Sequence, residues 1–247
     1  MSNSIVIIPT FNEIENVDYI INAVFALPEK VDILIVDDNS PDGTAGVVQI
    51  MQQQYNTKRQ RLHLLNRTGK HGIGTAYLEG FRYALDKGYE YILEMDADFS
   101  HDPKDLPRLI DACEKDGHDM SIGSRYVTGV NVVNWPMGRV LLSWFASWYV
   151  RIITGIPVYD TTAGFVCYKR KVLETLPLDE IRFVGYAFQI EMKFKVWKYG
   201  FRIKEVPIIF TDRTRGTSKL SSRIFREAFL GVIQLEVNSW FTDYETE

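Results

Sequence analysis

The chain has 247 residues, of which 46% are hydrophobic and 24% are charged, and its formal net charge is −4. These values are typical of an ordinary globular protein that buries one substantial core. The two cysteines, Cys113 and Cys167, show no Cys-x-x-Cys spacing and accompany no His cluster, which argues against a zinc site and for a reduced, cytosolic compartment.

The small net charge conceals an asymmetry between the two halves of the chain. Residues 1–120 carry a net charge of −9, and residues 121–247 carry +5. This pattern is either chance surface charge or a cation site that faces an anion site. Nucleic acid is a poor candidate partner, because no compact Lys/Arg block is interleaved with base-stacking aromatic residues. No segment reaches the roughly 18–20 uninterrupted apolar residues of a membrane span, and we expect no signal peptide.

The first 125 residues alternate between strand-like and helix-like patterns four times. Apolar runs predict strands at 5–8, 33–36, 62–65, 91–94 and 120–124, and Pro9 is expected to end the first of them. Segments with helical periodicity lie between these runs, at about 14–24, 44–54, 72–85 and 103–113. Such alternation predicts an α/β fold with a doubly wound, mainly parallel sheet and right-handed crossovers.

The second half of the chain is less regular. Its pattern predicts helices at about 138–154, 186–199 and 223–240, and strands at 163–168 and 203–210. Residues 212–222 are polar, basic and contain glycine, so we expect a mobile loop, and residues 242–247 form an acidic tail. We treat residues 1–241 as a single domain.

Polar clusters follow three of the predicted strands: 9–13, 37–39 and 96–98. In a doubly wound sheet these clusters share the carboxyl edge, where open α/β sheets bind their ligands. Asp96 and Asp98 follow a buried strand and offer hard oxygen ligands to a divalent cation, which can hold a diphosphate. Each cluster alone has a simpler explanation, since Glu13 can be a first-turn helix acid and Asp38 an Asx turn. The glycine-rich phosphate loops are missing, so phosphates would be held through a cation.

These motifs resemble glycosyltransferase family 2 and, more narrowly, its polyprenol (dolichol)-phosphate mannose synthases. The resemblance runs in the same order from Ile5 to about Lys219, and its segments are Pro9-Thr10-Phe11-Asn12-Glu13, Val36-Asp37-Asp38-Asn39-Ser40-Pro41-Asp42-Gly43-Thr44, Gly72-Ile73-Gly74-Thr75-Ala76-Tyr77, Met95-Asp96-Ala97-Asp98-Phe99-Ser100-His101-Asp102-Pro103, Gly123-Ser124-Arg125-Tyr126, Asn134-Trp135-Pro136 with Arg139, and Arg213-Thr214-Arg215-Gly216-Thr217-Ser218-Lys219-Leu220.

The resemblance implies a GT-A type nucleotide-sugar transferase that moves mannose from GDP-mannose to a polyprenyl (dolichyl-type) phosphate and inverts the anomeric centre. It implies a nucleotide-sugar-binding half at 1–125 and an acceptor and lid half at 126–241. It also assigns residues: Pro9, Phe11, Glu13, Val36 and Asp38 to the nucleotide pocket; Asp96, Ala97 and Asp98 to the nucleotide sugar; Arg125, Arg213 and Lys219 to the donor and phosphate site; Arg125 and Arg139 to the acceptor phosphate; and Asp96, Asp98 and Arg125 to catalysis.

A divalent cation, Mg²⁺ or Mn²⁺, is implied as well, with Asp98 as its direct ligand and Asp96 and Ser100 as further candidates. The chain departs from the family pattern at two positions. Phe11 stands where many relatives have Tyr, and Ser100 stands where some have an amide ligand. The alternatives are a family-2 transferase with another donor, such as UDP-glucose, or another acceptor, and a non-catalytic nucleotide-sugar-binding subunit.

The aromatic stripe of the predicted helix at 138–154 has two interpretations. Its Trp and Phe residues either pack into the core or lie in a membrane interface, where the polyprenyl acceptor would be met. The second interpretation places the protein in the cytoplasm, peripheral at the cytoplasmic face of a membrane. It would act there alone or with small membrane partner subunits.

Overall fold

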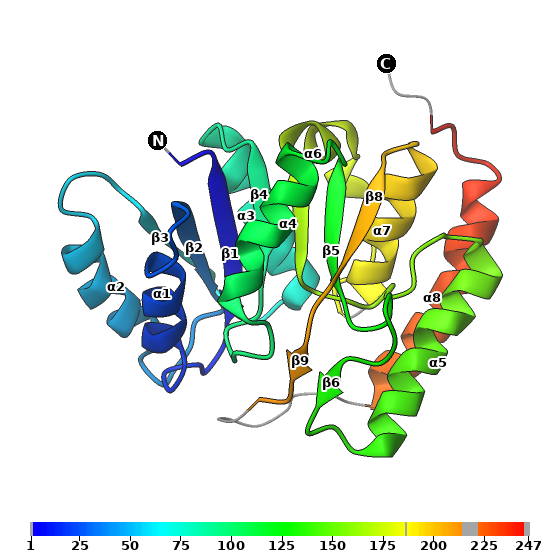
Figure 1. Ribbon diagram of the computed structural model, residues 1–247, viewed down its shortest axis with the longest axis horizontal. Helices are drawn as coiled ribbons and strands as arrows, with labels where there is room; N and C mark the ends of the chain where they lie inside the picture. Colours follow the sequence, from blue (N-terminus) through cyan, green and yellow to red (C-terminus); the bar gives the residue numbers. More distant parts are fainter. Residues whose placement is uncertain (1, 186, 214–221, 245–247) are drawn as a thin grey trace.

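The computed structural model of the chain describes residues 2–185, 187–213 and 222–244. A seven-stranded sheet forms its centre, with strand order β3-β2-β1-β4-β7-β5-β8 (Figure 1). All neighbouring strands run parallel except β7, which is antiparallel to both β4 and β5. The strands are β1 (Ser4–Thr10), β2 (Val31–Asp37), β3 (Leu62–Asn66), β4 (Tyr91–Glu94), β5 (Met120–Ser124), β7 (Val166–Lys169) and β8 (Ile203–Pro207). The expected mainly parallel sheet is therefore confirmed.

Helices cover both faces of the sheet and enclose a hydrophobic core on each. One face is covered by α1 (Val17–Phe25), α2 (Thr44–Tyr55) and α4 (Leu106–Glu114), which follows the short 3₁₀ turn η1 (Pro103–Asp105). The other is covered by α3 (Ile73–Asp86), α6 (Arg170–Thr175) and α7 (Ala187–Lys198), with the 3₁₀ turn η2 (Leu178–Glu180) between the last two.

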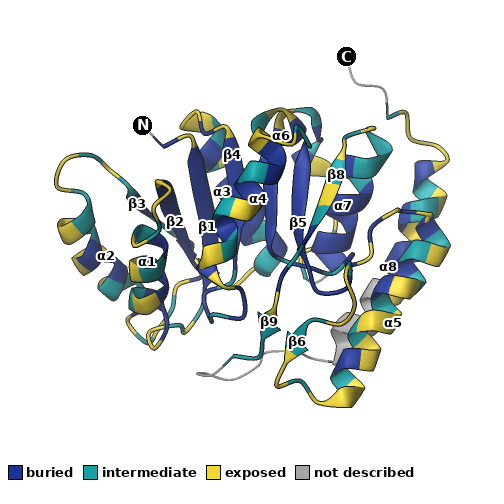
Figure 2. Ribbon diagram, in the orientation of Figure 1, coloured by how far each residue is buried: buried dark blue, intermediate teal, exposed yellow. Residues whose placement is uncertain are grey.

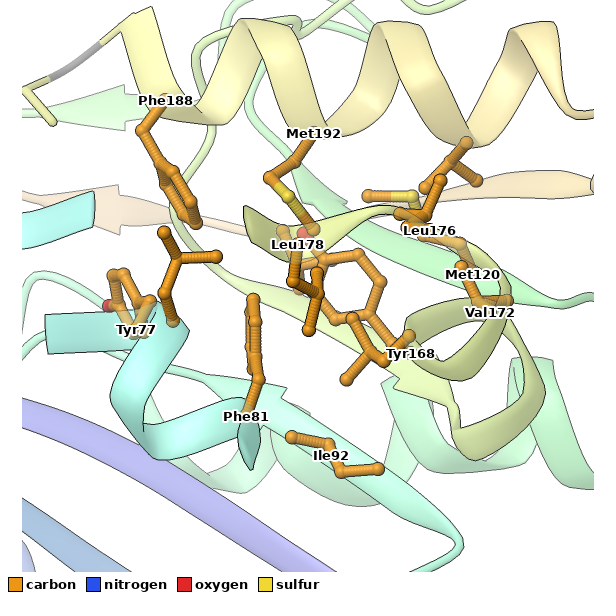
Figure 3. Packing of buried hydrophobic residues seen from close by; sticks show 14 of the residues in the cluster. Tyr77, Phe81, Ile92, Met120, Tyr168, Val172, Leu176, Leu178, Phe188 and Met192 are labelled. Atoms are coloured by element: carbon orange, nitrogen blue, oxygen red, sulfur yellow. The ribbon is translucent and has the colours of Figure 1, made fainter. Parts of the chain in front are cut away.

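Aromatic side chains fill the core between α3, β7 and α7 (Figure 3). The ring of Phe81 meets that of Tyr168 edge to face at 5.4 Å and lies 6.4 Å from that of Phe188. All three side chains are fully buried. Burying one such ring stabilises the fold by about 2–3 kcal/mol, so this cluster fixes β7 beneath the two helices.

The predicted end of the first strand was wrong, and the strand predicted at 163–168 begins only at Val166. β1 does not end at Pro9 but continues through it to Thr10, in register with β2. Ile7 accepts a hydrogen bond from the N–H of Met95, and Pro9 faces the same neighbour two residues later, beyond the end of β4. No ladder hydrogen bond is therefore lost where proline lacks its N–H.

The expected strand at 203–210 is also divided in two. β8 ends at Pro207, which is paired with Ser124 at the end of β5. The chain then turns away, and β9 (Phe210–Thr211) pairs with β6 (Val132–Val133) in a separate two-stranded ribbon. The sequence pattern was continuous because both pieces are apolar, but β8 has no partner beyond Ser124.

The aromatic helix does not pack its stripe into the core. α5 (Met137–Thr154) and α8 (Ser222–Ser239) lie side by side at the end of the sheet, and much of α5 is exposed (Figure 2). Tyr149 stacks on Phe229 at 4.5 Å, while Trp144, Phe145 and Trp148 are 42–52% exposed. Core packing of this stripe is therefore wrong.

None of the helices in the described ranges is long and apolar enough to cross a membrane.

Candidate functional site

The ends of β1 and β2 form a hydrogen-bonded turn that fixes Asp38. Asp37 is buried and accepts hydrogen bonds from the Thr10 hydroxyl at 2.8 Å and from the Ser40 N–H and hydroxyl at 2.8 and 2.6 Å. The Asp38 N–H donates to the carbonyl of Thr10 at 2.9 Å. Asp37 thus shapes the turn, and Asp38 stands beside it at the carboxyl edge of the sheet.

Asp38 is also paired with Arg67, which lies just past the end of β3. Arg67 Nη1 lies 2.6 Å from Asp38 Oδ1, its Nε donates to Glu79 at 2.9 Å, and its Nη2 donates to Thr75 at 2.5 Å. Burial raises the pKa of Asp38, and the Arg67 charge opposes this shift. No sequence motif marked Arg67, because its role follows from the packing of α3 against the sheet.

The remaining predicted nucleotide-pocket residues surround this turn. Pro9 and Val36 are paired across β1 and β2. Phe11 lies under the ammonium group of Lys70, 4.8 Å from its ring centre. Glu13 accepts a hydrogen bond from Asn16 at 2.8 Å, and its N–H donates to Thr44 at 3.1 Å.

The acidic pair lies directly after β4, between the carboxyl end of β1 and the start of the antiparallel strand β7. Asp98 is buried, and its Oδ1 accepts hydrogen bonds from the Ser100 N–H at 3.1 Å and hydroxyl at 2.6 Å. Phe99 adopts a left-handed backbone, with φ of 61°, which is strained for an aromatic residue. The Asp96 side chain remains 37% exposed. Partial burial and the Asp98 charge raise its pKa, whereas Arg213 opposes that shift.

His101 holds this loop through a hydrogen bond to the backbone of Asp96. The Asp96 N–H donates to His101 Nδ1 at 3.2 Å, and the imidazole stacks on Phe165 at 4.8 Å. Burial lowers the pKa of His101 to about 4, so the ring is neutral at pH 7 and its Nδ1 can accept. His101 stands within the motif at 95–103, but its sequence context did not predict this supporting role.

Arg125 lies one residue past β5 and is 7% exposed. Its Nε and Nη2 donate to the two carboxylate oxygens of Asp160 at 2.7 and 2.6 Å, and its backbone N–H donates to the same carboxylate at 2.9 Å. The guanidinium carbon lies 5.6 Å from the ring centre of Trp135 and 5.5 Å from that of Phe210. Arg125 was a predicted site residue, whereas Asp160 lies in none of the motifs and was not predicted.

Two ion pairs lead from Asp98 toward Arg139. Arg213 Nη2 lies 2.8 Å from Asp98 Oδ2, and the adjacent Asp212 lies 2.8 Å from Arg139 Nη1. The guanidinium carbon of Arg139 stands 4.1 Å from the Trp135 ring centre, so Arg139 and Arg125 border the same indole. The structure therefore brings together the predicted Asp98, Arg213, Arg139 and Arg125.

One predicted site residue, Lys219, and most of the expected 212–222 loop lie outside the described residues. A cleft of about 740 Å³ opens beside the acidic pair rather than over it. Ser100 and Thr211 contribute to its wall, together with residues of η1, α4 and the end of β8.

The acidic pair is chemically suited to a divalent cation. Asp98 Oδ2 already forms an ion pair with the positively charged Arg213. Carboxylate oxygens are also the ligands that Mg²⁺ and Mn²⁺ prefer. Within residues 2–185, 187–213 and 222–244, no group of three His, Cys, Asp or Glu side chains could enclose a metal. Substrate oxygens and water would therefore complete the shell. Ser100 is better placed to orient Asp98, because its hydroxyl donates to that carboxylate.

Comparison with known proteins gives the class. A model of glycosyl transferase family 2 matches residues 5–176. The chain is 44% identical over 231 residues to polyprenol monophosphomannose synthase of Mycolicibacterium smegmatis, an alignment that covers 94% of this chain and 86% of that protein. It is also 44% identical over 227 residues to undecaprenyl-phosphate mannosyltransferase of Micrococcus luteus, which covers 92% and 90%.

Solved structures of similar fold are more distant in sequence. Glucosyl-3-phosphoglycerate synthase of Mycobacterium tuberculosis, in complex with Mn²⁺ and UDP, aligns with a TM-score of 0.67 at 16% identity over 97% of this chain and 81% of that chain. A mannosyltransferase of Pyrobaculum calidifontis in complex with GDP-mannose and Mn²⁺ aligns with a TM-score of 0.61 at 16% identity, covering 98% and 64%. The chain belongs to glycosyl transferase family 2.

Proposed function

We propose that this chain is an inverting mannosyltransferase that moves mannose from GDP-mannose to a polyprenyl phosphate. The observation that carries the proposal is the gathering of Asp98, Arg213, Arg139 and Arg125 at one edge of the sheet. Two 44% identical relatives, whose names specify mannose transfer to polyprenyl phosphates, support the choice of sugar and acceptor.

In this proposal the first half of the chain supplies most of the nucleotide-sugar site, and the second half supplies most of the acceptor site and completes the donor phosphate site. Residues 1–125 bind the nucleotide sugar, with Pro9, Phe11, Glu13, Val36 and Asp38 lining the nucleotide pocket. Asp96, Ala97 and Asp98 contact the sugar diphosphate, and Arg213 and Lys219 neutralise its phosphates. Residues 126–241 provide the acceptor side, where Arg139 and the neighbouring Arg125 bind the acceptor phosphate.

The reaction joins an acceptor phosphate oxygen to the anomeric carbon and releases GDP. The attacking phosphate is already ionised near neutral pH, so no side chain needs to remove a proton. Arg125 and Arg139 hold this anion, since the planar guanidinium group can bind two phosphate oxygens at once. Arg213 and Lys219 stabilise the charge that develops on the departing diphosphate.

A divalent cation, Mg²⁺ or Mn²⁺, would be held by Asp98, and Asp96 would orient the nucleotide sugar or a metal-bound water. When bound, the cation would neutralise the diphosphate leaving group. Arg213 contacts Asp98 at 2.8 Å in the structure described here, so this side chain would exchange the carboxylate for donor phosphate when the cation binds.

The exposed face of α5 and α8 is proposed to rest on the cytoplasmic face of a membrane, where the polyprenyl phosphate lies. Leu141, Trp144, Phe145, Trp148 and Ile152 on α5 are 42–58% exposed. On α8, Leu230, Ile233 and Val237 are 40–61% exposed. Trp and Leu side chains on one helical surface favour the interface between headgroups and acyl chains. Arg139 lies in the first turn of α5, close to where a lipid phosphate would enter.

Liposome sedimentation tests this membrane face. Wild-type protein should sediment with anionic vesicles, and Trp148→Glu should reduce the bound fraction severalfold, because a charge at the interface opposes insertion. The matched control is Ile50→Glu, since Ile50 is an apolar α2 residue that is 69% exposed but remote from α5. Equal binding by all three proteins would refute the membrane face.

Transfer of radiolabelled mannose to a short polyprenyl phosphate tests the function directly. We expect transfer from GDP-mannose that depends on Mg²⁺ or Mn²⁺, and loss of metal-dependent donor binding in Asp98→Ala. Asp96→Ala should keep some donor binding. Thermal shift with GDP and UDP separates the donors. Stabilisation by UDP but not GDP would replace mannose transfer with another family-2 reaction, and donor binding without transfer would indicate a non-catalytic subunit.

A further inference from the structure

The Arg125 guanidinium is held on one edge by a carboxylate that no motif marked. Asp160 is fully buried in the segment between α5 and β7. It accepts three hydrogen bonds from Arg125, from the backbone N–H at 2.9 Å, from Nε at 2.7 Å and from Nη2 at 2.6 Å. Thr162 accepts a further hydrogen bond from Nη2 at 2.8 Å. This is a paired, buried and directional contact rather than a surface ion pair.

Asp160 is itself fixed by the sheet. The N–H groups of Tyr159 and Asp160 donate to the two carboxylate oxygens of Glu205 at 2.7 and 2.9 Å, and Glu205 lies in the middle of β8. At the other end of the same segment, Lys193 of α7 donates to the carbonyl of Ala163 at 2.6 Å. A rigid strand and a buried helix thus position the carboxylate that positions Arg125.

This arrangement determines which part of the guanidinium can meet an anion. Nε and Nη2 are directed toward Asp160 and Thr162, whereas Nη1 donates no hydrogen bond within the described part of the chain. The rings of Tyr126, Trp135 and Phe210 surround the guanidinium at 5.1–5.6 Å. The amino group Nη1, with its two N–H donors, is therefore the edge available to an incoming phosphate oxygen.

Asp160 is also the main charge partner of Arg125. Asp96 is close enough to Arg125 to raise the pKa of the guanidinium by its charge, although Asp160 contributes more. Without Asp160 a buried guanidinium would have only the carboxylates of the acidic pair to pair with. Arg125 would then compete with Arg213 for the Asp98 carboxylate.

We propose that Asp160 is a positioning residue that holds Arg125 with its Nη1 group facing the acceptor phosphate, and so sets acceptor binding without contacting either substrate. The proposal rests on the function proposed above, in which Arg125 binds that phosphate. It predicts a division between the substrates, because the pocket for the nucleotide lies at β1 and β2 and does not involve Asp160.

The first test is binding of farnesyl phosphate by calorimetry in the absence of donor. Asp160→Asn keeps the size of the side chain but removes its charge, and it should weaken binding about tenfold, as expected when one member of a buried charge pair is lost. Asp179→Asn is the matched control, since that carboxylate is 91% exposed and paired with Arg82. Thr162→Val, which removes a single hydrogen bond, should weaken binding by less, about threefold.

The second test is steady-state transfer with both substrates varied. In Asp160→Asn, the KM for polyprenyl phosphate should rise about tenfold, and the KM for GDP-mannose should stay within twofold. In an Arg125→Met background, Asp160→Asn should have little further effect, because the two residues act as one unit. A merely structural role would instead change both KM values and add to the Arg125→Met effect.

The outcomes separate this inference from the proposed function. Unchanged farnesyl phosphate affinity in a folded Asp160→Asn protein, or additive effects in the double variant, would overturn the positioning role. If Asp160→Asn fails to fold, Thr162→Val decides, and unchanged affinity in that variant overturns the role as well. Absence of mannose transfer by the wild type, with weakened farnesyl phosphate binding in the variants, would overturn the proposed reaction but support the positioning of Arg125.

Discussion

Arg67 shows how a single residue outside every motif can control a predicted site residue. Its side chain is 3% exposed and joins Asp38, Glu79 and Thr75. Arg67→Met should leave the Asp38 carboxylate buried without its partner, which typically costs about 3–5 kcal/mol of unfolding free energy. The pKa of Asp38 should rise further, and nucleotide binding should weaken. Urea denaturation and calorimetric GDP titration measure the two effects.

The control for this prediction is an exposed ion pair. Arg82 and Asp179 lie 2.6 Å apart, but their side chains are 47% and 91% exposed. Arg82→Met should therefore change the unfolding free energy by less than about 1 kcal/mol. Equal effects of the two substitutions would show that the Arg67–Asp38 pair does not stabilise the carboxyl edge.

At this scale, the sequence located the acidic and basic ends of the site but not what holds them. Asp98, Arg125, Arg139 and Arg213 stand in recognisable motifs and lie together as expected. Arg67 and Asp160 each contact a motif residue from more than 25 positions away in the chain. Periodicity carries no information about such partners, because they are chosen by the packing of distant elements.

The helices and strands were predicted well where local pattern decides them. β5 has the expected bounds Met120–Ser124, and the three strands that carry acidic clusters are adjacent in the order β2-β1-β4. The errors occurred where a neighbouring strand decides instead. Pro9 stays in β1 because β4 has already ended on that side, and the 203–210 run divides because β5 ends at Ser124.

The contact between α3 and β1 provides a prediction at the element scale. A Cβ atom on Gly80 would lie 2.7 Å from Cγ2 of Ile7, so the absence of a side chain lets the helix approach the strand. Gly80→Ala should destabilise the protein by about 1–3 kcal/mol through overpacking. Ile7 is fully buried and has no room to move away. Denaturant unfolding measures this loss.

The same substitution on another helix is the control. Gly46 lies in α2, and a Cβ atom there would meet nothing within 4 Å. Gly46→Ala should therefore leave the protein unchanged or stabilise it by up to about 1 kcal/mol, because alanine favours helix. Stabilisation by both substitutions would contradict the close approach of α3 to β1.

For the whole molecule, the two halves of the chain share one sheet and the hydrophobic cores on both of its faces. β7 from the second half lies antiparallel between β4 and β5 of the first half. Beneath the acidic pair, Gln189 donates to Glu94 at 2.5 Å and accepts from the Lys193 ammonium at 2.9 Å. Lys193 also reaches the carbonyl of Ala163 at 2.6 Å. The strand and helix pattern of the first 125 residues does not indicate this insertion, because β7 comes from the second half of the chain.

Lys193 makes this shared core sensitive to pH. Burial lowers its pKa to about 8, against the attraction of Glu94, which raises it. Lys193→Met should cost about 2–4 kcal/mol at pH 7, because Glu94 and three oxygen acceptors lose their partner.

The sign of the pH effect follows from proton binding. In the unfolded chain the lysine pKa is about 10.4, so between pH 8 and 10 the unfolded state binds more protons than the folded state. The stability that wild-type protein has over Lys193→Met should therefore grow across this range, by at most about 1.4 kcal/mol per pH unit. Urea denaturation at pH 7, 8, 9 and 10 measures the difference.

Lys204→Met, at an exposed position of the edge strand β8, should give a difference that stays constant. A constant difference for Lys193→Met would mean that Lys193 keeps its charge throughout, and the buried network would then be a fully ionised pair with Glu94.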